Sequence, residues 1–199
     1  MIIESINKDK KGKYLIKIGS SIYEFNEDII VEFNLYKGKE IDDKLLNDAI
    51  SSNSLNDYYN KALVYSTKYF KGSGEVIEYL KDKGLNDNDS KAIVNKLIER
   101  RIINDEKIVE SLIYSLSKSS NGRLLIKEKL LAKRFDSKLI DLKLDCMDFD
   151  IYLEGLNKLY EKNKHKYDKY PDYARIAKLK NYLYSRGYSS NDISNLDIK

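Results

Sequence analysis

Apolar and polar residues alternate over the first 25 positions, which is the pattern of half-buried β-strands. The turn-forming run Gly19–Ser21 separates two of the alternating stretches. The positions that carry the pattern are Ile2, Ile3, Ile6, Tyr14, Ile16, Ile18, Ile22, Tyr23 and Phe25. We therefore predict a small antiparallel sheet at the start of the chain.

Helical spacing replaces this alternation from Glu27 onward, because Ile29, Ile30 and Phe33 lie one and four positions apart. Lys37-Gly38 supplies a stop, and a second short helix is expected at 42–50. The polar run SSNSLND at 51–57 is predicted to be a linker.

A repeat of about 50 residues dominates the rest of the chain. Each copy has a leucine, then four positions later a residue in the place of a helix-ending glycine, then an apolar residue. The three copies are Leu80, Gly84, Leu85; Leu130, Arg134, Phe135; and Leu183, Gly187, Tyr188. Glycine suits a left-handed residue after a helix, so Arg134 predicts a strained or differently capped end.

Apolar positions at helical spacing on both sides of each joint predict two more helices in every copy. Three short helices bury little surface alone, so neighbouring units must pack on one another. We predict a mainly α fold with three tandem three-helix repeats in an elongated, curved array, preceded by a small N-terminal antiparallel β element. The predicted divisions are 1–50 for the N-terminal extension, then 57–104, 105–147 and 148–199 for the repeats.

Composition removes most enzyme classes, because Cys146 and His165 are the only residues of their types and no glycine-rich phosphate loop is present. The carboxylates Asp141, Asp145 and Asp148 are explained by helix faces and N-caps. We expect no catalytic residue, no metal and no cofactor. The chain lacks the roughly 18 to 20 apolar residues of a membrane span and a signal layout, so a cytoplasmic monomer without membrane contact is expected.

Charge is unevenly placed around the total of +4. Residues 1–56 hold 8 Lys/Arg and 10 Asp/Glu, which gives −2, whereas residues 57–199 hold 28 and 22, which gives +6. Tyrosine is common, with 17 copies. A basic, tyrosine-rich helical part suits contact with an anionic partner.

Four groups of cations are candidate contacts with an anionic partner, such as DNA phosphates or the acidic residues of a protein. The first interleaves with Tyr69 and Phe70, the second follows a predicted helix, the third stands in the second repeat, and the fourth lies in the tract NKHKYDKYPDYAR. The groups are Lys68, Lys71, Lys81 and Lys83; Arg100 and Arg101; Arg123, Lys127, Lys133 and Arg134; and Lys164, Lys166 and Arg175.

Each group also has a purely structural interpretation. Tyr69 and Phe70 could be core residues with the lysines as a solvated rim. Arg100 and Arg101 could simply stabilise a helix C-terminus. The fourth tract could stack on bases, or it could be a solvated loop that ends at Pro171, where a helix would start. In the second repeat, an arginine at 134 where glycine would be less strained favours a use in binding.

Four blocks of the sequence have an informative order and spacing. They are EFNLYKGKEIDD at 32–43, ALVYSTKYFKGSGEVIEYLKDKG at 62–84, IINDEKI at 102–108 and NGRLLIKEKLLAKRF at 121–135. These blocks resemble the successive blocks of the RecX family of RecA-regulating proteins. From Gly122 it is eight residues to Leu130 and twelve to Arg134, the spacing of the family's Gly-Pro, leucine and Lys-Gly-Ile. The departures are Arg123 for proline, Arg134 for glycine, Asn104 for aspartate and Gly72 for serine.

The resemblance implies a regulator that binds RecA assembled on single-stranded DNA, with the DNA as a secondary contact, and that inhibits the recombinase. It implies no chemistry of its own. A second hypothesis, from another class, is a helical protein that binds DNA directly and acts without a recombinase.

Overall fold

The computed structural model describes residues 1–196. Its N-terminal element is a three-stranded antiparallel sheet in the order β1-β2-β3, formed by β1 (Ile3–Lys8), β2 (Tyr14–Ile18) and β3 (Ser21–Phe25). Ile16 faces Ile6 on β1 and Tyr23 on β3. The predicted sheet is therefore confirmed.

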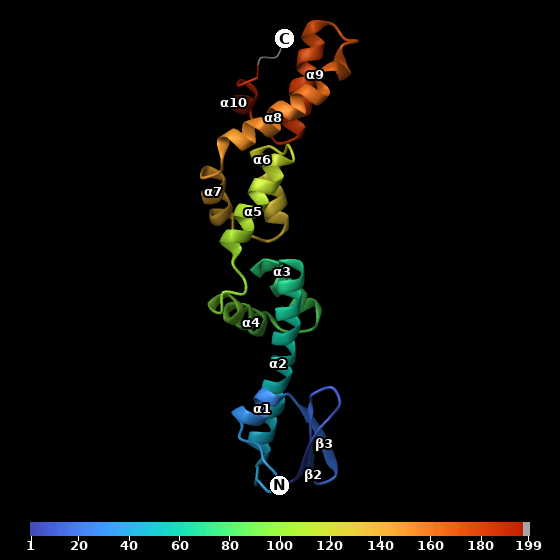
Figure 1. The fold of residues 1–199 in the computed structure, drawn as a ribbon, viewed down its shortest axis with the longest axis vertical. Coiled ribbons are helices and arrows are strands. Elements are labelled where there is room, and N and C mark those ends of the chain that lie inside the picture. Colours follow the sequence, from blue (N-terminus) through green and yellow to red (C-terminus); the bar gives the residue numbers. More distant parts are fainter. Residues whose placement is uncertain (197–199) are drawn as a thin grey trace.

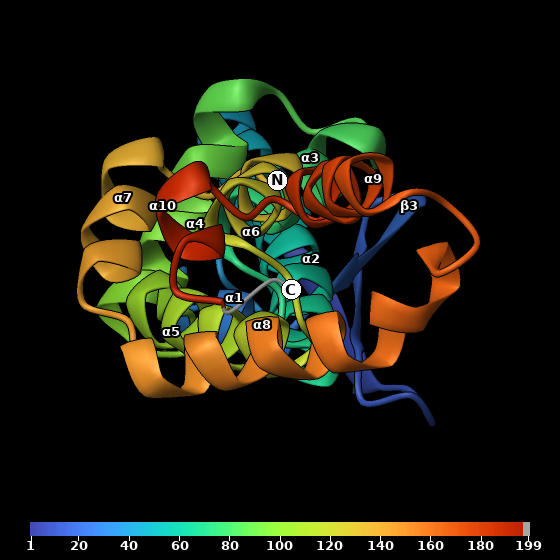
Figure 2. The same cartoon turned by 90° about the horizontal axis from the view of Figure 1, so that it is seen from above.

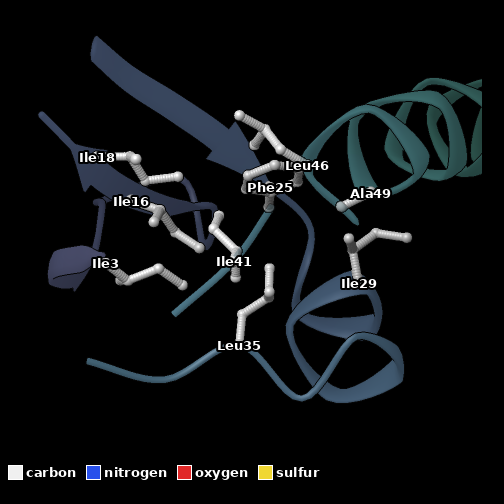
Figure 3. Close-up of a cluster of buried hydrophobic side chains, with 9 residues drawn as sticks. All are labelled: Ile3, Ile16, Ile18, Phe25, Ile29, Leu35, Ile41, Leu46 and Ala49. Atoms are coloured by element: carbon white, nitrogen blue, oxygen red, sulfur yellow. The ribbon is translucent and has the colours of Figure 1, made fainter. Parts of the chain in front are cut away.

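A small core covers one face of this sheet (Figure 3). The sheet, α1 (Glu27–Glu32), the following loop and the first turns of α2 (Asp43–Tyr69) all contribute side chains to it. The buried residues are Ile3, Ile16, Ile18, Phe25, Ile29, Leu35, Ile41, Leu46 and Ala49. Because α2 continues past this core, the N-terminal element is joined to the helical part by a rod of 27 residues.

The prediction of a linker at 51–57 is wrong, since these residues lie inside α2. Their polar side chains bind the end of the sheet. Asn53 Oδ1 accepts hydrogen bonds from the backbone N–H of Asn26 (2.8 Å) and from its side-chain amide (3.0 Å), and Asp57 Oδ1 accepts one from that amide at 2.9 Å. Residues 51–57 are polar because they make these contacts, and α2 continues through them without a break.

The remaining chain is helical, and the units follow one another from the N-terminal end to the C-terminal end of an elongated molecule (Figure 1). Figure 2 views the same row from its C-terminal end. The helices are α3 (Ser73–Asp82), α4 (Asp87–Glu99), α5 (Asp105–Lys118), α6 (Arg123–Ala132), α7 (Ser137–Asp145), α8 (Phe149–Asn163), the 3₁₀ helix η1 (Lys164–Tyr167), α9 (Asp172–Ser185) and α10 (Ser190–Ile193). The predicted fold class is confirmed.

The three predicted joints have one backbone geometry. Gly84, Arg134 and Gly187 have φ of 94°, 64° and 85°. In each joint the next residue's N–H bonds back to the leucine carbonyl, at 3.1 Å from Leu85 and 3.3 Å from Phe135 and Tyr188. Arg134 thus keeps the ordinary joint and accepts the strain, which is about 1 to 2 kcal/mol for a left-handed residue with a Cβ.

The left-handed turn that ends the middle helix of one unit contacts the first residues of the middle helix of the preceding unit. The clearest case is the contact between α9 and α6. Gly122 N–H donates to the Arg186 carbonyl at 2.8 Å, and Leu124 N–H donates to the Gly187 carbonyl at 3.1 Å. A Cβ on Gly122 would run into the backbone of Gly187. Two of the amides at the start of α6 are therefore satisfied by the turn that ends α9, and the Arg123 amide between them donates to the Tyr152 hydroxyl of α8 at 3.3 Å.

The first junction repeats this arrangement in a weaker form. A Cβ on Gly72 would meet the ring of Phe135, and one on Gly74 would meet the Arg134 carbonyl. The Ser73 backbone N–H donates to Asp105 of α5 at 2.9 Å, so the cap of α3 also comes from the next unit. Whereas α5 packs along α8 at the second junction, no pair of helices within residues 1–196 packs so extensively across the first.

We expect Gly122→Ala to lower the free energy of unfolding by about 1 to 3 kcal/mol, because the new methyl group meets main chain that has no room to move. Gly72→Ala should cost less, because its obstacle is the far end of a phenyl ring. Urea unfolding followed by far-UV circular dichroism measures both. Equal stability of Gly122→Ala and the parent chain would contradict the backbone contact.

Candidate binding surface

The 13 predicted contact cations fall into two classes by their ion pairs. Eight lie within 4 Å of a carboxylate: Lys71, Lys81, Arg123, Lys127, Lys133, Arg134, Lys164 and Arg175. Within residues 1–196, five have no such pair: Lys68, Lys83, Arg100, Arg101 and Lys166. The second class keeps its positive charge uncompensated and is better suited to attract an anionic partner.

Tyrosine rings from α2 and α3 form the base of the first group. Tyr65 and Tyr79 stack with centroids 4.1 Å apart and planes at 9°, and Tyr69 tilts against Tyr65 at 5.7 Å. Lys68 lies over Tyr69 at 5.3 Å and Lys83 over Tyr79 at 5.7 Å. We call these five residues the tyrosine–lysine patch.

An open hollow lies beside this patch and reaches the N-terminal element. Lys13 and Asn26 line it together with Lys61, Val64 and part of the patch. Lys13 Nζ is paired with Asp57 at 2.9 Å, and this hydrogen bond is the main reason that its pKa is raised. The N-terminal sheet therefore shapes one wall of the candidate surface.

The interpretation of Tyr69 and Phe70 as core residues is wrong. Tyr69 is 54% exposed and Phe70 is 81% exposed. Both lie at the end of α2, where Phe70 has a φ of 49°. The first group is therefore an exposed surface that contains aromatic rings, with no aromatic core beneath a lysine rim at these two positions.

The structure also joins cations that are far apart in the sequence, by 62 residues for Lys71 and Lys133 and by 53 for Lys81 and Arg134. Lys71 and Lys133 both approach Glu75, at 2.6 and 3.6 Å. Lys81 and Arg134 both approach Glu78, at 3.6 and 3.4 Å. We call these six residues the junction cluster, because they bridge the first and second units. The hydrogen bond between Lys71 and Glu75 raises the pKa of Lys71.

Arg123 is the first residue of α6 and Lys127 lies in its middle, whereas Lys133 and Arg134 of the cluster follow the end of this helix. Arg123 Nη2 donates to the Leu144 carbonyl at 2.5 Å and contacts Asp145 at 3.1 Å. Lys127 Nζ lies 2.5 Å from Asp141. Both side chains hold α6 against α7, and this structural role is sufficient to explain why they are charged.

Arg100 is the C-cap of α4 and Arg101 follows in a left-handed conformation with φ of 58°. This is the predicted position near a helix C-terminus. Arg100 Nη1 donates to the Tyr59 hydroxyl at 2.8 Å, and its guanidinium lies 5.2 Å from that ring centroid. Arg101 is exposed.

The fourth tract is more ordered than a solvated loop. Its start forms η1, and α9 begins directly after Pro171, which takes the N-cap position. Lys164 is paired with Glu161 at 2.6 Å, whereas Lys166 lies over Tyr182 at 5.8 Å. Arg175 is held between Asp168 and Asp172, at 3.8 and 3.3 Å.

Sequence reasoning missed the stacked pair Tyr65 and Tyr79. A signal was available, because Tyr58, Tyr65 and Tyr69 are spaced seven and four apart on what proves to be one helix. The predicted linker at 51–57 ended just before Tyr58, so the spacing was not assigned to one helix.

Across residues 1–196, no group of three or more His, Cys, Asp or Glu is placed to hold a metal, and no helix has both the length and the apolarity to cross a membrane.

Comparison with known proteins gives one consistent result. A family model described as the third three-helix domain of RecX matches residues 150–196. "Regulatory protein RecX" of Streptococcus uberis is 34% identical over 95% of this chain and 73% of its own length. The protein of the same name from Streptococcus mutans is 31% identical over 100% of this chain and 78% of its own.

Solved structures agree with this result at the level of the fold. A "Crystal structure of regulatory protein RecX" superposes with a TM-score of 0.85 at 23% identity and covers 97% of both chains. The crystal structure of RecX from Lactobacillus salivarius gives a TM-score of 0.67 at 25% identity, over 72% of this chain and 94% of that one.

We expect Arg123→Met to lower the free energy of unfolding by roughly 1 to 2 kcal/mol, because the Leu144 carbonyl loses a charged donor. Lys127→Met should change it by less than about 1 kcal/mol, since it removes only a half-exposed ion pair. Thermal unfolding of the two variants beside the parent chain tests this order. A reversed order would contradict the structural role of Arg123.

Proposed function

Because the chain belongs to the RecX family, we propose that it is a regulatory protein that inhibits a RecA recombinase by binding the RecA filament on single-stranded DNA. The single observation that carries this proposal is the similarity to proteins named "Regulatory protein RecX", which extends over nearly the whole chain. Single-stranded DNA is proposed as a secondary contact.

The shape of the molecule supports this proposal. A row of units presents a long surface, and such a surface suits a partner that itself repeats along an axis. The uncompensated cations are spread along this row, from Lys68 and Lys83 in the first unit to Lys166 in the third. Contact with several subunits of a filament would use them together.

We place the main contact on the tyrosine–lysine patch, with Arg100, Arg101 and Lys166 as further contributors. The paired cations remain in the proposal with smaller expected effects, because a carboxylate already offsets each charge. They are Lys71, Lys81, Arg123, Lys127, Lys133, Arg134, Lys164 and Arg175.

Direct DNA binding is the second candidate function, and the tyrosine–lysine patch favours it. Exposed aromatic rings next to lysines are the usual means of holding single-stranded nucleic acid without sequence preference. This function would need no recombinase, and its affinity would fall steeply as salt rises.

We expect sub-stoichiometric amounts of this protein to inhibit the DNA-dependent ATPase of RecA, because blocking a filament at few points affects many subunits. A titration of the ATPase rate at fixed RecA and DNA measures this. Absence of inhibition, together with tight and salt-dependent binding to bare DNA, would contradict the first function and support the second.

We expect the double variant Lys68→Glu with Lys83→Glu to raise the concentration for half-inhibition by roughly tenfold, which corresponds to about 1.4 kcal/mol of binding. Both side chains are exposed and neither is within 4 Å of a carboxylate of residues 1–196. Both lie at the C-terminal end of a helix, where a carboxylate costs about 0.3 to 1 kcal/mol, so far-UV circular dichroism is used to check that the variant is folded. The same ATPase titration gives the comparison.

The matched control is Lys44→Glu with Lys138→Glu. It makes the same change in net charge at two exposed lysines, in the first turns of α2 and α7, where a carboxylate is well tolerated. Equal weakening by both double variants would attribute the effect to net charge and contradict the assignment of the patch.

A further inference from the structure

Phe70 combines two unfavourable features at one position. Its side chain is 81% exposed, and its backbone is left-handed with φ of 49°. Its N–H caps α2 by donating to the Ser66 carbonyl. Phenylalanine is a poor choice for a left-handed residue, and an exposed ring gains little from burial within the chain.

The equivalent position in the second unit shows that the fold does not require this side chain. Ser120 lies in the turn after α5 and is left-handed with φ of 58°, and the N–H of the next residue bonds five residues back, as the N–H of Lys71 does after Phe70. Gly72 and Gly122 stand two residues further on and begin the next helix in each unit. A serine satisfies the same turn, so the ring at 70 has no role in forming it.

Exposed residues of α2, the helix that Phe70 caps, indicate what kind of partner this end of the helix could contact. Tyr69 next to it is 54% exposed, and Val64 on the same helix is 60% exposed. Val64 and Tyr69 line the same open hollow, together with Lys61 and Lys68. The end of α2 thus presents apolar side chains beside lysines.

We propose that Phe70 is a docking anchor that inserts into an apolar pocket of a protein partner whose rim is acidic. This inference rests on the proposed function and deepens it, because it names the kind of partner surface that the end of α2 fits. Buried aromatic anchors commonly supply most of the energy of a protein interface. Lys68, which is two residues before Phe70 and lies over the ring of Tyr69 at 5.3 Å, fits a carboxylate at the rim of such a pocket.

A protein pocket fits the end of α2 at Phe70 better than a nucleic-acid base does. Base recognition uses the faces of rings, but Val64 is an exposed aliphatic side chain and has no such face. Tyr65 and Tyr79 are already stacked on each other. An apolar pocket accepts Phe70 and the aliphatic surface near it in one interface.

The test is Phe70→Gly, which we expect to raise stability and to weaken function. Glycine removes the strain at φ of 49°, so the midpoint of thermal unfolding should rise by about 2 to 4 °C. The concentration for half-inhibition of the RecA ATPase should rise by roughly tenfold or more. Unchanged inhibition by this variant, beside an inhibitory parent chain, would overturn the inference alone.

Two controls separate the ring from the backbone. Ser120→Gly relieves the same kind of strain at the equivalent turn, so it should raise the unfolding midpoint and leave inhibition unchanged. Phe70→Leu keeps an apolar anchor on the strained backbone and should retain most of the inhibition. A comparable loss of inhibition in Ser120→Gly would overturn the inference.

Binding to a bare labelled single strand, measured by fluorescence anisotropy, is the remaining arm. We expect Phe70→Gly to bind the strand as the parent chain does. A variant that loses strand binding, together with a Phe70→Leu that also fails, would assign base stacking to the ring and overturn the protein pocket. A parent chain that does not inhibit RecA would overturn the proposed function and this inference with it.

Discussion

The row of units depends on one contact, in which the start of a middle helix lies against the left-handed turn that ends the next unit's middle helix. Main chain meets main chain there, as the hydrogen bonds from Gly122 to Arg186 and from Leu124 to Gly187 show. The approach is possible only because Gly122 has no Cβ. Amides at the N-terminus of α6 thus meet carbonyls at the C-terminus of α9, so the two helix dipoles are aligned head to tail.

The same close approach occurs at the first junction, where a Cβ on Gly74 would meet the Arg134 carbonyl, but polar side chains take the place of the backbone hydrogen bonds. Asp105 caps α3, and the pairs from Lys133 and Arg134 to α3 hold the two units together. Cations that a sequence alone marks as contacts are therefore partly used inside the molecule. Lys68, Lys83 and Phe70, at the ends of α2 and α3, hold no units together among the described residues. The proposed contact therefore centres on them.

Features with local causes could be predicted from the sequence. The sheet follows from alternation, and the joints follow from the spacing between Leu80 and Leu85 and its two repeats, because a helix end is set by a few adjacent residues. The prediction of a linker at 51–57 was wrong because Asn53 and Asp57 are polar in order to bind Asn26, a residue that is distant in the sequence. The stacked pair Tyr65 and Tyr79 of the candidate surface could not be predicted for a similar reason, since their stacking depends on how α2 and α3 pack.

Left-handed turns at equivalent places supply a way to separate side chains needed by the fold from those that are not. Gly84 and Gly187 give the turn without strain, and Arg134 accepts the strain while its guanidinium reaches Glu78 in the neighbouring unit. Phe70 accepts similar strain, but its ring points into solvent and its place is filled by Ser120 one unit later. Strain that the surrounding structure does not explain is more informative about a partner than charge is, because lysines are common on every surface and a left-handed, exposed phenylalanine is rare.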